Sequence, residues 1–300
     1  MKQKALIIYN SVKYFSQIMK DNNYMVFDLY KNETNIFRRI IKKLCEKLNF
    51  SEHLVYDDWK YKLNDVNTII VFAPIYEKSI NYIKSINPNV RIISWYWNAA
   101  YRNGKPDKFV IENTEGWGFD KAHSVNFNFK YNNTFYFKEI KLQRNKIEYD
   151  ILFVGRAKYR EEKLLELEKY FKSLSLKTFF HIVPNRGDKN PNKIKTIPYK
   201  DYLDLISKTN IILDRLPPFQ IGLTLRAMES IFFEKKLITD NPNITREPFF
   251  HSDNIYILNY HNKYELSEFI LRPYHKIDEE IIMKYDFASW YNRIINGVEF

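Results

Sequence analysis

Residue types that can hold an anion are gathered in one short stretch, IGLTLRAMES (221–230). Two prolines, Pro217 and Pro218, come shortly before this stretch, and an apolar run follows it. Because prolines interrupt a helix, we predict that a strand ends before them and that a helix starts near Gly222. The free N–H groups and the positive dipole end of a helix start bind anions. Gly222 would let a ligand approach the backbone closely, and Thr224 would contribute a hydroxyl.

Arg226 and Glu229 lie three positions apart and therefore share one face of this predicted helix. One interpretation is an exposed ion pair, which contributes only about 0.3 kcal/mol. The apolar residues on both sides, Leu223 among them, instead favour a largely buried helix. A buried arginine and a buried glutamate need polar partners. We therefore expect this face of the helix to contact a ligand.

A second group of basic residues follows another apolar run. A predicted strand ends at Gly155, and Arg156, Lys158 and Arg160 come before the next helical pattern. One interpretation is a solvated helix start. However, positive charge at a helix start opposes the helix dipole unless an anion lies there. We therefore predict a phosphate site at this strand end.

These residues need elements that bring them together, and the apolar patterning supplies them. Short apolar runs alternate with helical patterns along the chain, which is typical of a parallel α/β fold. We predict a first α/β domain over 1–140, a second over 150–275, and a helical segment over 276–300 that packs back toward the first domain. The polar residues 138–149 form the predicted linker. Two Rossmann-like domains would face a cleft at the carboxyl ends of their sheets, where such folds bind ligands.

The composition limits the function classes. The 300 residues carry a formal net charge of +11, which indicates an anionic partner or a general compositional bias. None of the seven glycines precedes Gly104, so the first strand-to-helix turn lacks the glycines of a dinucleotide site. The sequence has no GxxxxGK[ST], CxxC, HExxH or DxD motif, so we predict no metal and no cofactor. The single cysteine, Cys45, and the absence of a long apolar run favour a cytoplasmic protein.

The quoted motifs carry a resemblance to a known family. The chain from YDILFVGR through GLTLRAMESIFFEKKLIT resembles the donor-binding half of GT-B glycosyltransferases. With IISWYWN, FDKAHSVNFNFKYNNTFYF and YDFASWYNRII added, it is similar to bacterial lipopolysaccharide and capsule glycosyltransferases. This resemblance implies that the second domain binds a nucleotide sugar, that Arg156 and Lys158 hold its diphosphate, and that Glu229 hydrogen-bonds the ribose. Retaining members carry a second glutamate where this chain has Ile221, so the stereochemistry stays open.

The predicted donor site combines both basic groups with His181, which lies in a strand between them. This histidine is either a core residue or part of the site. Its residues are Gly155, Arg156, Lys158, His181, Gly222, Leu223, Thr224, Arg226 and Glu229. Transfer of a sugar requires neutralisation of the diphosphate leaving group. Without a DxD motif, fixed cations and a helix start would provide it, so we expect metal-independent activity.

The first domain, which would bind the acceptor, supplies candidates for the general base and for sugar contacts. An inverting reaction needs a general base, and Glu77 and Asp120 follow strand patterns of the first domain. Glu77 is equally explained as a solvated first-turn residue, and Asp120 as a helix N-cap. Trp97 and Asn98 are predicted sugar or acceptor contacts, unless Trp97 only fills the core.

The resemblance implies a lipid-linked or oligosaccharide acceptor and work at the inner face of the membrane. The basic helical pattern 35–48 is the predicted docking element, or else an ordinary surface helix. Two other functions stay open at this point: a non-catalytic nucleotide-sugar-binding protein and a basic nucleic-acid-binding protein. We expect no nucleic-acid partner, because the lysines are scattered and most aromatic residues lie inside strand patterns.

Overall fold

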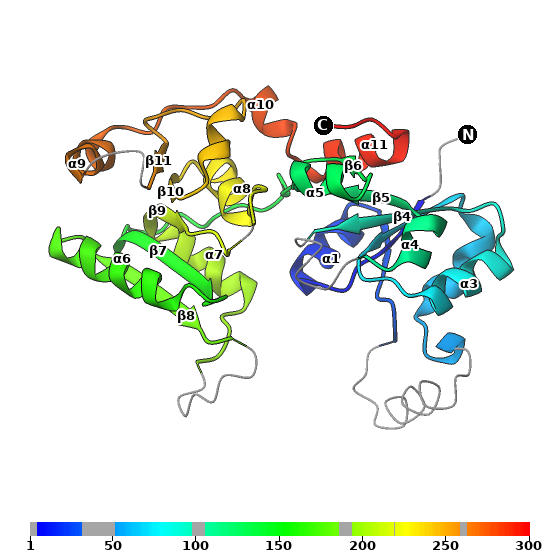
Figure 1. Cartoon of the computed structure of the whole chain (residues 1–300). Coiled ribbons are helices and arrows are strands. Elements are labelled where there is room, and N and C mark those ends of the chain that lie inside the picture. The colour runs from blue at the N-terminus through cyan, green and yellow to red at the C-terminus, as the bar shows by residue number, and fades with distance from the viewer. Residues whose placement is uncertain (1–4, 32–51, 98–105, 186–193, 219, 259–262) are drawn as a thin grey trace. The chain divides into compact units, whose positions relative to one another are not determined.

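The computed structural model describes residues 5–31, 52–97, 106–185, 194–218, 220–258 and 263–300 (Figure 1). The chain forms two compact units. Unit 1 comprises residues 1–132 and 291–300, and unit 2 comprises residues 133–290. The end of the chain therefore belongs to the N-terminal unit, and the polar segment 138–149 lies inside unit 2.

Unit 1 is built on a six-stranded parallel sheet with the order β2-β1-β3-β4-β5-β6. Its strands are β1 (Ala5–Ile8), β2 (Met25–Phe27), β3 (Thr68–Phe72), β4 (Arg91–Tyr96), β5 (Glu115–Gly118) and β6 (Lys130–Tyr131). The central strands are nearly continuous apolar runs, because a parallel sheet is covered on both faces.

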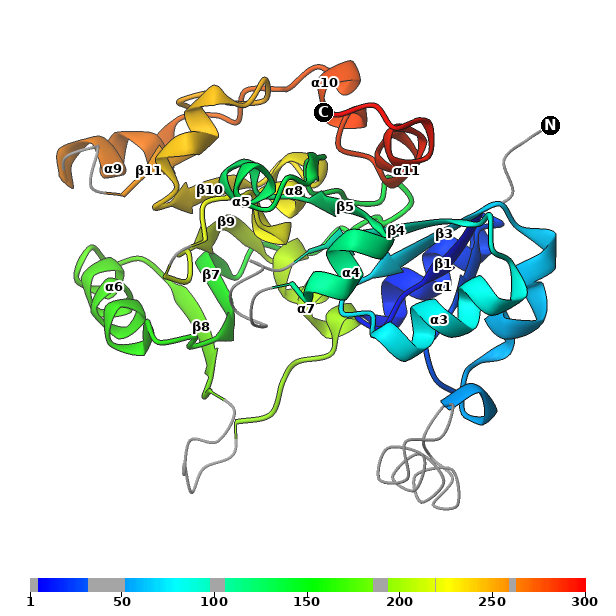
Figure 2. The ribbon, with the colours of Figure 1, turned by 45° about the vertical axis from the view of Figure 1, so that its right-hand side comes forward.

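Helices and short 3-10 helices surround this sheet. They are α1 (Lys13–Asp21), η1 (Glu52–Leu54), η2 (Asp58–Asp65), α3 (Glu77–Ile86), α4 (Lys108–Asn113) and α5 (Lys121–Asn126). Figure 2 shows α3 and α4 running across one face of the sheet. Ile80 and Ile83 of α3 join Leu6 and Ile69 of the strands in one buried core, as expected for the apolar side of an amphipathic helix.

The C-terminal helix α11 (Phe287–Asn296) ends in unit 1, where Arg91 holds it. The guanidinium of Arg91 donates to the backbone carbonyls of Ile294 and Ile295, at 3.1 and 2.6 Å. Two further N–H groups of Arg91 donate to the carboxylate of Glu115, at 2.7 and 2.8 Å. The last carbonyl groups of a helix have no hydrogen-bond donor within the helix, and Arg91 supplies donors to two of them in α11.

Unit 2 is built on a five-stranded parallel sheet with the order β11-β10-β9-β7-β8. Its strands are β7 (Tyr149–Arg156), β8 (Thr178–Val183), β9 (Thr209–Asp214), β10 (Lys236–Thr239) and β11 (Ile255–Ile257). Its helices are α6 (Glu161–Ser173), α7 (Tyr199–Ser207), α8 (Leu225–Phe232), η4 (Pro242–Arg246), α9 (Lys263–Leu271) and α10 (Glu279–Met283). Leu164 and Phe171 of α6 share a core with Leu266 and Phe269 of α9 and with one face of the strands.

The strand order of unit 2 reverses next to its first strand. The chain runs from β7 to β8 on one side and then returns to β9 on the other side of β7. The carboxyl ends of β7 and β9 therefore flank a topological switch point, where open α/β sheets bind ligands.

The predicted helix start at Gly222 is wrong by three residues. Helix α8 begins at Leu225, and Thr224 is its N-cap because the Thr224 hydroxyl accepts a hydrogen bond from Ala227 N. A threonine at this position ends the preceding loop by satisfying a free N–H group of the first turn. Gly222 consequently lies in the loop that leads to the helix.

Candidate functional site

Arg226 connects the two strands at the switch point of unit 2. Its Nη2 donates to the carbonyl oxygen of Val154 in β7, at 2.8 Å. Its Nη1 lies 3.5 Å from Asp214 Oδ1 at the end of β9, and Asp214 Oδ2 accepts from the Thr224 hydroxyl at 2.8 Å. The first turn of α8 is therefore fastened to both strand ends by charge-assisted hydrogen bonds.

Gly155 leaves room for this arrangement. A Cβ atom at Gly155 would lie 2.4 Å from Arg226 Nη2, closer than any two non-bonded heavy atoms of this kind approach. The backbone of β7 thus leaves space that the guanidinium fills. The packing of the Arg226 side chain therefore explains why a glycine stands at position 155.

Two guanidinium groups are held at the end of β7. Arg226 and Arg160 lie over the ring of Phe153, with distances of 5.0 and 5.4 Å to its centroid. Arg226 Nε is buried and has no hydrogen-bond partner in the part of the chain that the structure describes. Asp214 forms an ion pair with Arg226. Two guanidinium groups at one strand end favour the binding of an anion.

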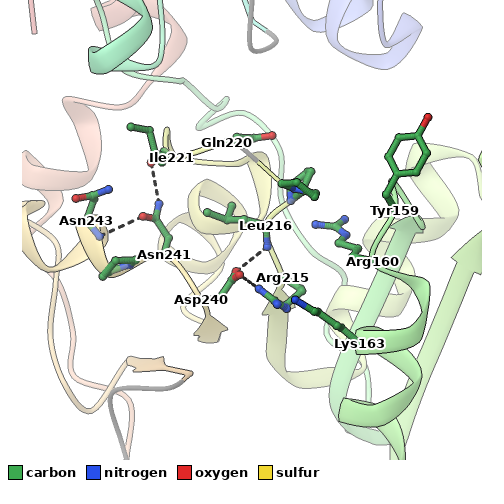
Figure 3. Close-up of a pocket in the computed structure, with 13 residues that line it drawn as sticks. Tyr159, Arg160, Lys163, Arg215, Leu216, Gln220, Ile221, Asp240, Asn241 and Asn243 are labelled. Carbon is green, nitrogen blue, oxygen red and sulfur yellow. Dashed lines mark hydrogen bonds and ion pairs between the residues drawn. The ribbon is translucent and has the colours of Figure 1, made fainter. Parts of the chain in front are cut away.

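A pocket of about 350 Å³ opens at the same carboxyl edge of the sheet (Figure 3). Its walls come from the segments that follow β7, β9 and β10. The lining residues are Tyr159, Arg160, Lys163, Arg215, Leu216, Pro217, Pro218, Gln220, Ile221, Asp240, Asn241, Pro242 and Asn243. The volume lies in the range of small-molecule sites, roughly 300–1,000 Å³.

The charged groups of the pocket are mainly positive. Arg160 is only 4% exposed, Lys163 is exposed, and Arg215 forms an ion pair with Asp240 (Figure 3). Burial lowers the pKa of the Arg215 guanidinium, which nevertheless stays charged at neutral pH. Asp240 also accepts from Leu216 N at 2.6 Å, so it fixes the backbone that carries Arg215.

Asn241 connects two walls of the pocket. Its Nδ2 donates to the carbonyl oxygen of Ile221 at 3.1 Å, and its Oδ1 accepts from Asn243 N at 3.1 Å. The loop before α8 is thereby tied to the loop after β10. The pocket is therefore largely formed without a ligand, as small-molecule sites usually are.

Glu229 lies deeper than the resemblance implies. Its carboxylate is 1% exposed, and its two oxygens accept from the hydroxyls of Tyr199 and Tyr202 at 2.7 and 2.8 Å. The Tyr136 hydroxyl shares a hydrogen bond of 2.5 Å with Tyr199. Burial raises the pKa of Glu229 to about 7, against the opposing effect of the tyrosine hydroxyls and Arg226.

The other predicted donor residues do not line the pocket. Arg156 donates from Nη1 to the carbonyl oxygen of Pro184 at 3.2 Å, on the β8 side of the sheet. Lys158 lies in the loop before α6 with a left-handed φ of 47°. His181 is hydrogen-bonded through Nε2 to the carbonyl of Lys195 at 2.8 Å. The structure therefore brings Arg160, rather than Arg156 or Lys158, to the pocket.

The acceptor-side candidates in unit 1 have different surroundings. Glu77 is exposed in the first turn of α3. Asp120 is buried, and its carboxylate accepts from His123 N at 3.3 Å as the N-cap of α5, which is the alternative that the sequence left open. Trp97 packs against Tyr9, Phe15 and Phe72 at the carboxyl ends of β1 and β3.

Some predictions fall outside the described residues, namely those on Asn98, Cys45 and the basic pattern 35–48. Within the described ranges, no three His, Cys, Asp or Glu side chains are grouped so that they could hold a metal ion. None of the described helices is both long and apolar enough to cross a membrane.

The sequence interpretation missed most of the pocket. Arg215 and Asp240 directly follow two predicted strands, so their positions at the carboxyl edge of the sheet could have been predicted from the sequence. Lys163 and Tyr159 offered no comparable signal, because one lies on an amphipathic helix and the other in a loop.

Comparison with known proteins is informative at the level of the fold. No protein-family model matches the chain, and no curated protein matches its sequence. The structure of S. aureus MnaA with UDP matches with a TM-score of 0.50 and 10% identity, over 98% of this chain and 95% of that one. An alpha-glucosyltransferase in complex with UDP and a 13-mer DNA containing an HMU base matches with a TM-score of 0.51 and 10% identity, over 97% and 92%. These likenesses confirm the predicted fold, two Rossmann-like α/β units of the GT-B kind.

Proposed function

We propose that this protein is a glycosyltransferase that binds a nucleotide sugar in the pocket of unit 2. The observation that carries the proposal is the position of Arg160, Arg215 and Lys163 in one pocket at the carboxyl edge of a doubly wound sheet. Guanidinium and ammonium groups bind phosphate oxygens by charge-assisted hydrogen bonds. Two proteins of the same fold were crystallised with UDP, which makes a nucleoside diphosphate the first ligand to test.

The same cations would assist the reaction. When the glycosidic bond to the nucleotide breaks, negative charge develops on the departing diphosphate. Fixed cations in a partly dry site stabilise that charge without any rearrangement. Arg160 and Arg215 are well suited to this role, because both are mostly buried and their surroundings fix them. We therefore expect transfer without a divalent metal.

We place the diphosphate on Arg160 and Arg215 rather than on Arg156 and Lys158. Arg156 is already hydrogen-bonded toward β8, and neither it nor Lys158 lines the pocket. We assign Glu229 no contact with the diphosphate, since both its oxygens already accept hydrogen bonds from tyrosines and it does not line the pocket.

The acceptor would bind to unit 1. The resemblance noted in the sequence suggests a lipid-linked or oligosaccharide acceptor of the cell envelope. Glu77 is the better candidate for the general base, because it is exposed, whereas the carboxylate of Asp120 is buried and caps a helix. Trp97 is the candidate for stacking against a sugar ring.

A thermal-shift screen with nucleoside diphosphates and sugar nucleotides, in EDTA, tests the proposal. Ligand at about 100 times its Kd adds roughly 2.7 kcal/mol of stability, a shift of several degrees. Sugar transfer from the best donor to an envelope glycan acceptor then separates a transferase from a protein that only binds the nucleotide. Absence of any shift across the panel, or loss of turnover in EDTA that Mg²⁺ restores, would contradict the proposal or its metal-free chemistry.

A further inference from the structure

The pocket of unit 2 has two chemically different levels. Its inner part carries Arg160, which is 4% exposed, and the Arg215–Asp240 ion pair. Its rim carries Tyr159, which is 86% exposed, and Ile221, which is 43% exposed. A ligand that matches both levels has an anionic part and a part with an apolar surface.

The backbone holds Tyr159 in an unusual conformation. Lys158 and Tyr159 have φ angles of 47° and 64°, two consecutive non-glycine residues in the left-handed region. This conformation is unfavourable for residues with a Cβ atom, so the surrounding fold must maintain it. The turn directs the aromatic ring outward at the pocket rim (Figure 3).

The ring of Tyr159 is not used by the fold. Tyr159 is 86% exposed, and no hydrogen bond or ring contact joins it to another residue in the described ranges, although Arg160 next to it is almost fully buried. A large aromatic side chain exposed in this way leaves apolar surface in water. Its face is available to a planar group that enters the pocket.

We propose that Tyr159 stacks on the nucleobase of the bound nucleotide, with the diphosphate on the cations below. This inference rests on the proposed function and specifies which residue recognises the nucleoside. Stacking on an aromatic ring suits every base, because each base has a π-face. Pro218 and Ile221, which also line the pocket, supply apolar surface, and the amides of Gln220 and Asn243 supply hydrogen-bonding groups for the edge of such a base.

A second type of ligand also combines an anion with an apolar part, namely an isoprenoid diphosphate. A flexible isoprenoid chain binds more tightly to any apolar surface, whereas a nucleobase binds more tightly to a flat aromatic ring. Tyr159→Leu separates the two, because it retains apolar area and removes the aromatic face. Tyr159→Phe retains the ring and removes only the hydroxyl.

The experiment is calorimetric titration of the full chain with UDP and with inorganic pyrophosphate. We expect Tyr159→Ala and Tyr159→Leu to weaken UDP binding about tenfold, within the range of measured base–aromatic stacking. Tyr159→Phe should bind UDP within about twofold of the wild type, and pyrophosphate binding should be unchanged in all three variants. Tyr61→Ala, which removes another exposed tyrosine outside the pocket, is the matched control.

The outcomes separate the inference from the function on which it rests. Wild-type affinity for UDP in Tyr159→Ala or Tyr159→Leu would overturn the stacking inference and leave the nucleotide site intact. Equal weakening of UDP and pyrophosphate in Tyr159→Ala would also overturn it, because the loss would then concern the phosphates. Failure of the wild-type protein to bind UDP or any other nucleoside diphosphate would overturn the proposed function itself.

Discussion

Replacing Gly155 with alanine tests the packing at the switch point. The added Cβ would lie 2.4 Å from Arg226 Nη2, so the guanidinium must move. Movement breaks its hydrogen bond to Val154 O and weakens the ion pair with Asp214. Loss of a buried hydrogen bond to a charged group costs about 1.5–3 kcal/mol, and we expect a total near 3 kcal/mol. For a unit of this size, the melting temperature of unit 2 should fall by roughly 6–12 °C in calorimetry.

A double-mutant cycle shows whether Arg226 is the cause. Once Arg226→Ala has removed the guanidinium, the nearest atom to the new Cβ is Phe153 Cζ at 3.5 Å, an ordinary contact. Gly155→Ala should then cost less than about 0.5 kcal/mol, which gives a coupling energy above about 2 kcal/mol. An equal cost of Gly155→Ala in both backgrounds would refute this explanation of the glycine. A negligible cost in the wild-type background would refute it as well.

Three further predictions concern titratable groups. Burial raises the pKa of Glu229 to about 7 in the folded protein, so its contribution to stability is greatest at low pH and is lost as pH rises from about 4.5 to about 7. In urea unfolding, the stability of Glu229→Gln should therefore fall less over this pH window than that of the wild type. Parallel pH profiles of the two proteins would contradict the burial argument. Burial acts to raise the pKa of Glu115, but the hydrogen bonds from Arg91 and Lys130 outweigh it and lower this pKa to about 2. The stabilising effect of Glu115 is therefore present at neutral pH and is lost as pH falls from about 4.5 to about 2. Glu115→Gln should be destabilised at pH 7 and approach the wild type in acid, and a constant difference would count against the ion pairs. If Glu77 is the general base, Glu77→Gln should lower kcat by about 10²–10⁴-fold and leave the affinity for UDP unchanged. Asp120→Asn should keep its activity, and its side chain should still cap α5. The reverse result would assign the base to Asp120.

The sequence was sufficient for the elements that rest on local patterning. The central strands of both sheets are continuous apolar runs bounded by polar residues, and that pattern does not depend on distant contacts. The start of α8 was less accessible. Its position is decided by the hydrogen bond from Ala227 N to Thr224, and the glycine two residues earlier gave an equally reasonable start.

The candidate site was harder to predict because its contacts join distant segments. The carboxylate of Glu229 receives hydrogen bonds from two tyrosines of α7, which in sequence resemble ordinary core aromatics. Similarly, Arg226 is twelve residues from Asp214 and 72 from Val154. Which basic residue of the segment 156–160 reaches the pocket depends on two left-handed residues in that turn, which no periodicity indicates.

Titration of UDP into charge-reversal variants tests the central claim most directly. Lys163 and Lys169 are both exposed on α6, but only Lys163 lines the pocket, so neither change should disturb the fold. We predict that the wild type binds UDP, that Lys163→Glu weakens binding at least about tenfold through loss of a charge-assisted contact and added repulsion, and that Lys169→Glu has little effect. No binding of UDP by the wild type, or equal affinities in the two variants, would contradict a nucleotide site at this edge of the sheet.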